Sequence, residues 1–282
     1  DYKNPALEDS MIAAMKFWIK ESNIDGFRCD VAPDVPREFW IKCIAQLHKM
    51  KNVFMLAEGN EAWLHEAGFD ATYPWDAFNV MKLIARGDRP ALSLDTALAR
   101  VNETFPKNAL RLYFTSNHDE NSWNKADYGT MPGIIHAPFA VFTQTVERSV
   151  PLIYSGQEEP VLDSISFFYK DPVQFKKFGR EQFYKTLLAL HKRNQALAAN
   201  APYNKLKTKN DNALFAFERQ NKGDKILVVL NFSDHEQQLI WDDKPSAGRW
   251  TNVFSGKTET VNKGFLLPKW GYKLYELKKV VQ

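Results

Sequence analysis

The feature that most constrains the fold is a unit of strand followed by helix, repeated along residues 1–200. The expected strands are residues 25–32 (DGFRCDVA), 53–59 (VFMLAEG), 69–74 (FDATYP), 110–119 (LRLYFTSNHD) and 151–158 (PLIYSGQE). Helical patterns cover residues 4–22, 36–50, 78–85, 93–102, 137–147 and 180–199. Strands that alternate with helices are typical of parallel βαβ units, so we predict an α/β fold with a parallel sheet.

The first helical segment carries clear local signals. Asn4 can cap it and Pro5 suits its first turn, while Leu7, Met11 and Trp18 recur at helical spacing. We therefore expect a helix over residues 4–22, directly before the strand at residues 25–32.

Beyond residue 200 the pattern changes to short strands separated by Gly, Asp, Asn and Lys. The expected strands contain NALFAFER, KILVVLNFS, QQLIW, RWTNVFSG and KLYELK. Such a series is typical of a small antiparallel sandwich. We therefore predict two domains, residues 1–200 and residues 201–282.

Charge and cysteine content exclude several classes of protein. The 37 basic and 34 acidic residues are interspersed and give a net charge of +3, so nucleic acid is a poor candidate partner. No run of 18 apolar residues predicts a transmembrane segment, and the opening DYKNPAL is not a signal peptide. Cys29 and Cys43 lack the C-x-x-C spacing, so we expect two inert buried thiols and no metal site.

The segment DGFRCDVA combines an apolar face with two charges. In a strand, alternate side chains share a face, so Phe27, Cys29 and Val31 should point one way and Arg28 and Asp30 the other. Burying charges is costly unless they are paired and hydrogen-bonded. The pair is therefore either a structural salt bridge or part of a site.

Polar side chains lie at the carboxyl ends of three of the expected strands. These are Asp30, Glu58 and the pair His118 and Asp119. Taken singly, Asp30 could belong to a buried ion pair, Glu58 could begin a loop and Asp119 could cap a helix. Taken together they indicate a site, because active sites of β/α barrels are built at the carboxyl ends of several strands.

These motifs support a family resemblance. GFRCDVA, LAEG and FTSNHD resemble the second, third and fourth signature regions of the α-amylase family of glycoside hydrolases, and YSGQE resembles that family's last barrel strand. The resemblance implies a partial (β/α)8 TIM barrel, about strands 4 to 8, in residues 1–200. It also implies an all-β C-terminal domain in residues 201–282, and a chain that starts in the helix before strand four.

The same resemblance assigns roles to the polar residues. It implies that Asp30 is the nucleophile, that Glu58 is the general acid and base, and that Asp119 stabilises the transition state. Arg28 and His118 are then substrate-binding residues. The residues themselves favour these roles, because Arg28 should keep Asp30 ionised and the apolar approach to Glu58 should keep it protonated.

Aromatic side chains near the strand ends could stack on sugar rings. We assign Trp63 and Tyr73 to substrate binding, and note Trp75 and Trp123 as further candidates, although tryptophan and tyrosine are more commonly core or rim residues. His65 and His136 are expected to be loop or core histidines. No metal ligands are assigned; the resemblance allows calcium in a full-length enzyme, with most ligands in an N-terminal part.

The resemblance implies a retaining hydrolase acting on α-1,4-glucans, either starch or maltooligosaccharides, through a covalent glucosyl-enzyme intermediate. A glucosyl transferase or branch-active relative, and a non-catalytic carbohydrate-binding or scaffold protein, are the alternatives. The expected partners are an α-glucan and the chain's own N-terminal portion, without which we expect residues 1–282 to be poorly stable and inactive on starch. The resemblance favours a periplasmic or secreted protein, but the sequence leaves the compartment open.

Overall fold

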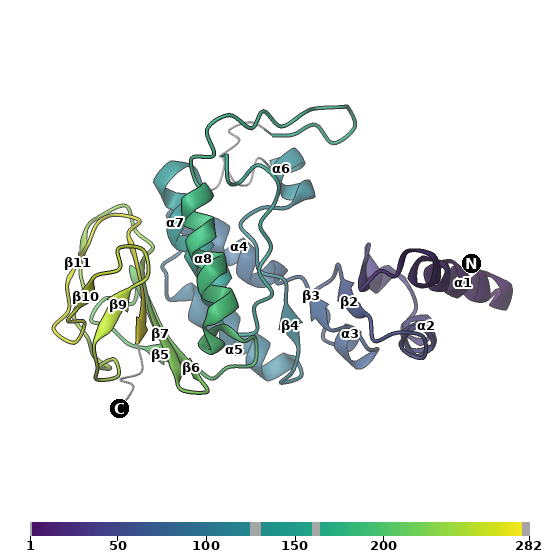
Figure 1. Cartoon of the computed structure of the whole chain (residues 1–282), viewed down its shortest axis with the longest axis horizontal. Coiled ribbons are helices and arrows are strands. Elements are labelled where there is room, and N and C mark those ends of the chain that lie inside the picture. Colours follow the sequence, from purple (N-terminus) through teal and green to yellow (C-terminus); the bar gives the residue numbers. More distant parts are fainter. Residues whose placement is uncertain (1, 125–130, 160–163, 278–282) are drawn as a thin grey trace. The chain divides into compact units, whose positions relative to one another are not determined.

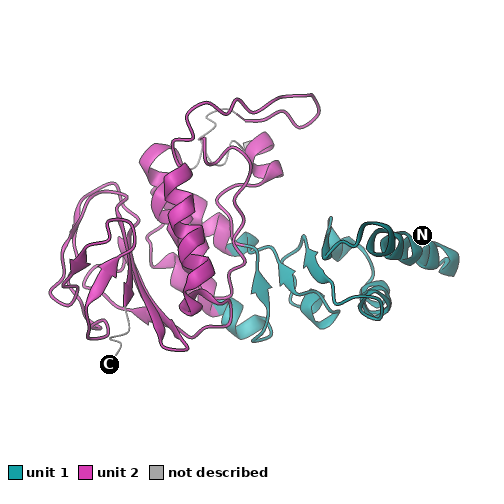
Figure 2. Ribbon diagram, in the orientation of Figure 1, with its two compact units in different colours: residues 1–76, 100–112 teal, residues 77–99, 113–282 magenta. Residues whose placement is uncertain are grey.

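The computed structural model describes residues 2–124, 131–159 and 164–277 (Figure 1). The chain forms two compact units, shown in different colours in Figure 2. Unit 1 comprises residues 1–76 and 100–112, and unit 2 comprises residues 77–99 and 113–282.

Unit 1 contains a parallel sheet of four strands in the order β1-β2-β3-β4. The strands are β1 (Gly26–Cys29), β2 (Phe54–Ala57), β3 (Ala71–Thr72) and β4 (Leu110–Arg111). All three neighbouring pairs are parallel. The prediction of a parallel sheet is confirmed for these four strands, although each is shorter than the apolar run that predicted it.

The fifth expected strand, at residues 151–158, is wrong. Residues 151–159 contain no strand, and residues 155–159 form turns. The N–H of Leu152 donates to the carbonyl of Tyr113 over 2.8 Å. The apolar run therefore has a backbone hydrogen bond to Tyr113 but lacks the repeated hydrogen-bond ladder that defines a strand.

The helices of unit 1 pack against the sheet and share an apolar core with it. The elements are α1 (Pro5–Ser22), the 3₁₀ turn η1 (Ala32–Asp34), α2 (Arg37–His48) and α3 (Trp63–Glu66). As predicted, Asn4 caps α1, since its side chain accepts the N–H of Ala6 over 3.0 Å. Ile12 of α1, Leu47 of α2 and Met55 of β2 belong to one buried apolar cluster, so α1, α2 and the sheet share a core.

Most helices associated with unit 2 correspond to predicted segments, but α6 begins inside the expected strand at residues 110–119. They are α4 (Trp75–Ala85), α5 (Ser93–Thr104), α6 (His118–Asn124), η3 (Gly133–Ile135), α7 (His136–Thr145), α8 (Glu181–Arg193) and η4 (Gln195–Leu197). The first residues of α4 and the last of α5 belong to unit 1. Nine of the ten residues of α7 are buried, from His136 to Thr145 with the exception of Ala137, so α7 is a central helix of this unit.

The C-terminal part of unit 2 is antiparallel, as predicted. Its strands are β5 (Tyr203–Leu206), β6 (Leu214–Asn221), β7 (Asp224–Asn231), β8 (Gln237–Gln238), β9 (Trp250–Asn252), β10 (Thr258–Glu259), β11 (Leu266–Leu267) and β12 (Tyr272–Leu277). Six form a sheet in the order β10-β9-β12-β7-β6-β5, and β11 pairs with β8. Leu267 of β11 and Val229 of β7 lie in one buried cluster, so the two sheets pack together.

Within residues 2–124, 131–159 and 164–277, we find no helix with the length and apolar character needed to span a bilayer.

The two cysteines are buried thiols, as the sequence predicts. Burial raises the pKa of Cys29 to about 12 and that of Cys43 to about 11.

We expect both cysteines to react with iodoacetamide at pH 8 at least about 100-fold more slowly than a free thiol, because little thiolate forms. Mass spectrometry of the native protein measures this, with the urea-unfolded protein as the fast-labelling control. Native labelling as fast as that control would contradict the closed core described here.

Candidate active site

Strands β1 and β2 bring two carboxylates to the same edge of the sheet. Asp30 directly follows β1 and Glu58 directly follows β2, whose last residues, Cys29 and Ala57, pair with each other. The N–H of Glu58 donates to the carbonyl of Cys29 over 2.9 Å. Gly26 allows this close pairing, because a Cβ there would lie 2.0 Å from the carbonyl oxygen of Phe54.

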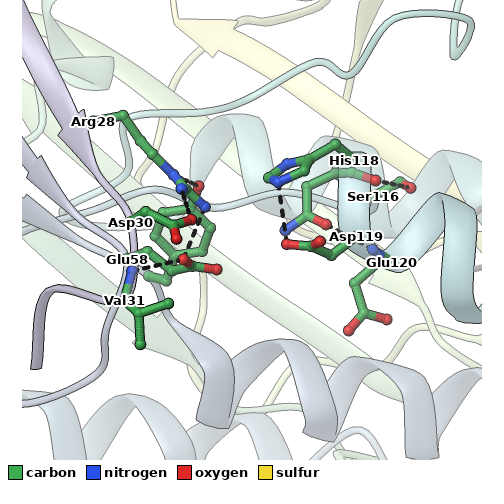
Figure 3. A network of polar contacts seen from close by, with 10 residues as sticks. Arg28, Asp30, Val31, Glu58, Ser116, His118, Asp119 and Glu120 are labelled. Atoms are coloured by element: carbon green, nitrogen blue, oxygen red, sulfur yellow. Dashed lines mark hydrogen bonds and ion pairs between the residues drawn. The ribbon is translucent and has the colours of Figure 1, made fainter. Parts of the chain in front are cut away.

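One guanidinium contacts both carboxylates. Arg28 Nη1 lies 2.5 Å from Asp30 Oδ1, and Arg28 Nη2 lies 3.0 Å from Glu58 Oε2 (Figure 3). The Nε of Arg28 donates to the hydroxyl of Tyr73 over 3.3 Å. Burial disfavours the charge of Arg28, but hydrogen bonds to Tyr73 and Asp30 and the charge of Glu58 outweigh it and raise the pKa of Arg28. The arginine is therefore a permanent cation between two acids.

The exposure of Asp30 argues against the interpretation of its ion pair with Arg28 as a buried structural salt bridge. Its side chain is 76% exposed, whereas Arg28 and Glu58 are both largely buried. A fully buried ion pair would leave both partners out of contact with solvent. Asp30 is accessible to a ligand while Arg28 holds it from one side.

Val31 does not lie on the apolar face with Phe27 and Cys29, so that prediction is wrong. The strand ends at Cys29, and Val31 adopts φ 38° and ψ 47° with 47% of its surface exposed. A β-branched residue in this left-handed region costs about 1–3 kcal/mol. In return its N–H donates to Glu58 Oε2 over 3.0 Å, so the strained turn supplies a second donor to that carboxylate.

The two aromatic residues assigned to substrate binding have different surroundings. Tyr73 is buried, and its ring centroid lies 5.3 Å from that of Trp75. Trp63 begins α3 and packs, partly buried, against the core cluster of unit 1. Tyr73 therefore acts on Arg28 through its hydroxyl, and sugar contact by either ring remains a prediction.

Sequence reasoning missed a fully buried arginine in β4. Arg111 donates through Nη1 to Thr72 Oγ1 over 2.5 Å and through Nη2 to the carbonyl of Tyr73 over 2.9 Å. It also donates to the side chain of Asn60, and its guanidinium lies 4.1 Å from the ring centroid of Phe105. The signal that could have revealed it is the charge within the apolar run LRLYF.

Arg111 supports the segments that carry the site. Asn60 lies two residues beyond Glu58, and Tyr73 is the residue whose hydroxyl contacts Arg28. His65 extends the network, with Nε2 2.9 Å from Thr72 Oγ1. Arg111 therefore joins the ends of β2, β3 and β4 behind the pair of acids.

Of the two histidines outside the motifs, His136 is a core residue as predicted, whereas His65 lies in the helix α3. His65 is partly buried and its Nδ1 lies 3.1 Å from the carbonyl of Phe69. His136 is buried, with Nε2 2.6 Å from the hydroxyl of Tyr184. Both are held by structural hydrogen bonds.

Unit 2 carries His118 and Asp119. They lie in the first turn of α6, whereas β4 ends at Arg111, so the prediction that they lie at the end of a strand is wrong. The side chain of Asn117 accepts the N–H of Glu120 over 2.8 Å. Asn117 is therefore the cap of α6, and the alternative that gave this role to Asp119 is wrong.

Both side chains of this pair are partly exposed, and His118 Nε2 lies 3.2 Å from Asp119 Oδ2 (Figure 3). The segment YSGQE lies beside them. Gln157 donates to Thr115 Oγ1 over 2.5 Å, and burial together with the charge of Asp119 raises the pKa of Tyr154.

Unit 1 thus brings together Arg28, Asp30, Glu58 and Tyr73, and unit 2 brings together His118 and Asp119. The meeting of Asp119 with the other two acids remains a prediction. Within the described ranges, no group of three or more His, Cys, Asp or Glu side chains is placed to hold a metal ion.

The chain combines a parallel sheet, whose adjacent strands β1 and β2 are each followed by an acid, with antiparallel sheets further along. It is therefore an α/β protein with a candidate site built on a pair of acids. The family described as "Alpha amylase, catalytic domain" matches residues 1–254, and the chain belongs to this family. The resemblance deduced from the motifs is confirmed.

Two relatives are identical to this chain at about a quarter of the aligned positions. A cyclomaltodextrinase from Thermoanaerobacter pseudethanolicus is 24% identical over 254 residues, which cover 86% of this chain and 43% of the relative. Neopullulanase 2 from Thermoactinomyces vulgaris is 26% identical over 275 residues, covering 90% and 45%. The chain therefore spans less than half the length of these two relatives.

Solved structures show the same fold. A maltogenic α-amylase, AmyB, from Thermotoga neapolitana matches with a TM-score of 0.79 at 22% identity, over 98% of this chain and 64% of that chain. An Anoxybacillus α-amylase matches with a TM-score of 0.81 at 18% identity, over 100% and 65%. At these identities the similarity shows the fold alone.

Proposed function

We propose that the protein is a retaining glycoside hydrolase that cleaves α-1,4-glucans such as starch or maltooligosaccharides. The observation that carries this proposal is the position of Arg28, 2.5 Å from Asp30 and 3.0 Å from Glu58, with both acids following adjacent parallel strands. Membership of the α-amylase family supports it, as do relatives named cyclomaltodextrinase, neopullulanase and α-amylase.

In the proposed reaction Asp30 attacks the anomeric carbon and forms a glucosyl ester. Glu58 gives its proton to the leaving glycosidic oxygen as that C–O bond breaks. Glu58 then takes a proton from water, the water oxygen bonds to the anomeric carbon, and the ester to Asp30 breaks. Arg28 contacts and orients both acids, and Asp119 and His118 bind sugar hydroxyls.

We also propose that the parallel sheet of β1 to β4 is part of a (β/α)8 barrel within residues 1–200, with β1 as about its fourth strand. Residues 201–282 then form the C-terminal β-sandwich. The parallel order of β1 to β4 and the change to antiparallel pairing at β5 support this division.

The stereochemistry of the product tests the mechanism. We expect the intact protein to release α-anomeric maltooligosaccharides first from maltoheptaose, because two successive displacements retain configuration. Proton NMR within the first turnovers distinguishes the anomers before mutarotation mixes them. Initial release of the β-anomer would overturn the retaining mechanism, and products longer than maltoheptaose would identify a transferase.

A further inference from the structure

Unit 2 carries a cluster of exposed aromatic side chains, here termed the aromatic platform, which consists of Trp123, Phe167, Phe168 and Tyr169. Their exposed fractions are 58%, 47%, 74% and 80%. The ring centroid of Trp123 lies 5.1 Å from that of Phe167 and 5.8 Å from that of Phe168. Three of the rings therefore form one contiguous surface, and Tyr169 follows it in the chain.

Hydrogen bonds hold the platform in place. The buried side chain of Asn121 on α6 accepts the N–H of Ile165 over 2.8 Å, which ties the loop at residues 164–180 to the helix that carries Trp123. Within the loop, the N–H of Tyr169 donates to Ser166 Oγ over 3.2 Å, and the N–H of Ser166 donates to Asp171 over 3.0 Å. Figure 1 shows this long loop close to α6.

Exposing neighbouring rings is unfavourable in water, because apolar surface is stabilised by burial. Contiguous exposed apolar surface on a folded protein commonly marks a place where a ligand or partner binds. The loop contacts keep these rings at the surface, and the platform is therefore a candidate binding surface.

The position of the platform indicates its occupant. Trp123 follows Asp119 by four residues on α6, a spacing that puts two side chains on the same helix face. The platform thus continues from the proposed sugar-binding pair. Its members are all aromatic, with Ser166, Lys170 and Asp171 beside them in the sequence. Flat apolar rings edged by polar groups match a pyranose, which has apolar C–H faces and a rim of hydroxyls.

We propose that the aromatic platform binds glucose rings of an α-glucan chain beyond the linkage being cleaved. This inference rests on the proposed function and adds to it a site for longer substrates. It predicts that the platform matters for maltoheptaose and not for a substrate with a single glucose ring.

The test uses W123A and F168A variants of the intact protein, because both side chains are more than half exposed. We expect kcat/KM for maltoheptaose to fall about 10-fold or more in each, with kcat/KM for p-nitrophenyl α-glucoside unchanged within about twofold. The matched control is F175A, because Phe175 is exposed and stacks on Phe178 in the same loop, outside the platform. Equal loss on both substrates, or no loss on maltoheptaose, would overturn the proposal.

A binding measurement separates this proposal from the proposed function. Maltoheptaose should bind the D30N variant with a dissociation constant about 10-fold lower than it binds a D30N/W123A double variant, as measured by calorimetry. If the wild-type protein hydrolyses no glucan but this difference persists, the platform stands and the hydrolase assignment fails. A second copy of the chain could also cover the platform, and sedimentation velocity of wild-type and W123A protein tests this. A dimer that W123A abolishes would overturn the proposal in favour of self-association.

Discussion

Replacement of Asp30 by asparagine is expected to reduce kcat on maltoheptaose on the order of 10⁴-fold or more in the intact protein, with little change in KM. The amide keeps the size of the side chain and can still lie beside Arg28, but it is a far weaker nucleophile. The glucosyl ester then cannot form at a useful rate. Initial rates of reducing-sugar release measure the effect.

Asp34→Asn is the matched control for this substitution. Asp34 lies four residues further on, in η1, and is also an exposed carboxylate. Its loss should change kcat by less than about twofold, since surface substitutions away from a site have small effects. Unchanged turnover in D30N would remove the nucleophile assignment and favour a non-catalytic carbohydrate-binding protein.

The Arg111→Met substitution is expected to lower the free energy of unfolding by about 3 kcal/mol. Methionine fills much of the same volume, but it leaves the hydroxyl of Thr72, the carbonyl of Tyr73 and the side-chain oxygen of Asn60 without their buried donor. Each buried group that loses its partner costs about 1–3 kcal/mol, and the arginine's own desolvation offsets part of the sum. Urea unfolding followed by circular dichroism measures the loss.

Arg100→Met is the comparison variant for Arg111. Arg100 is mostly exposed and lies 3.9 Å from Asp76, an arrangement worth less than about 1 kcal/mol. We expect its substitution to leave the unfolding midpoint almost unchanged. A midpoint for R111M equal to that of R100M would show that the network behind the two acids is not needed for stability.

Local sequence signals predicted the elements that short-range physics controls. Asn4 and Pro5 mark the start of α1 because capping needs only the neighbouring N–H groups. The apolar runs located β1, β2, β6 and β7, and the change of pattern near residue 200 located the change from parallel to antiparallel pairing. The motifs also identified Arg28, Asp30 and Glu58, which the structure brings into contact.

Other features depend on contacts between distant segments. The apolar run at residues 151–158 forms no strand, because a strand is defined by its ladder of partners and not by its composition. Val31 leaves the apolar face because β1 stops at Cys29, where the turn presents an N–H to Glu58, a residue 27 positions away. Sequence alternation alone cannot reveal where such a ladder ends.

The sequence by itself determined the family, the order of β1 to β4, and the chemical groups at the ends of β1 and β2, since these follow from residue type and local spacing. Only the tertiary structure decided that Arg28 contacts both acids, that Arg111 is buried behind them, and that Trp123 joins an exposed aromatic surface. The reason is physical: burial, ion pairing and ring packing depend on distances across the fold, which are set by how the elements pack.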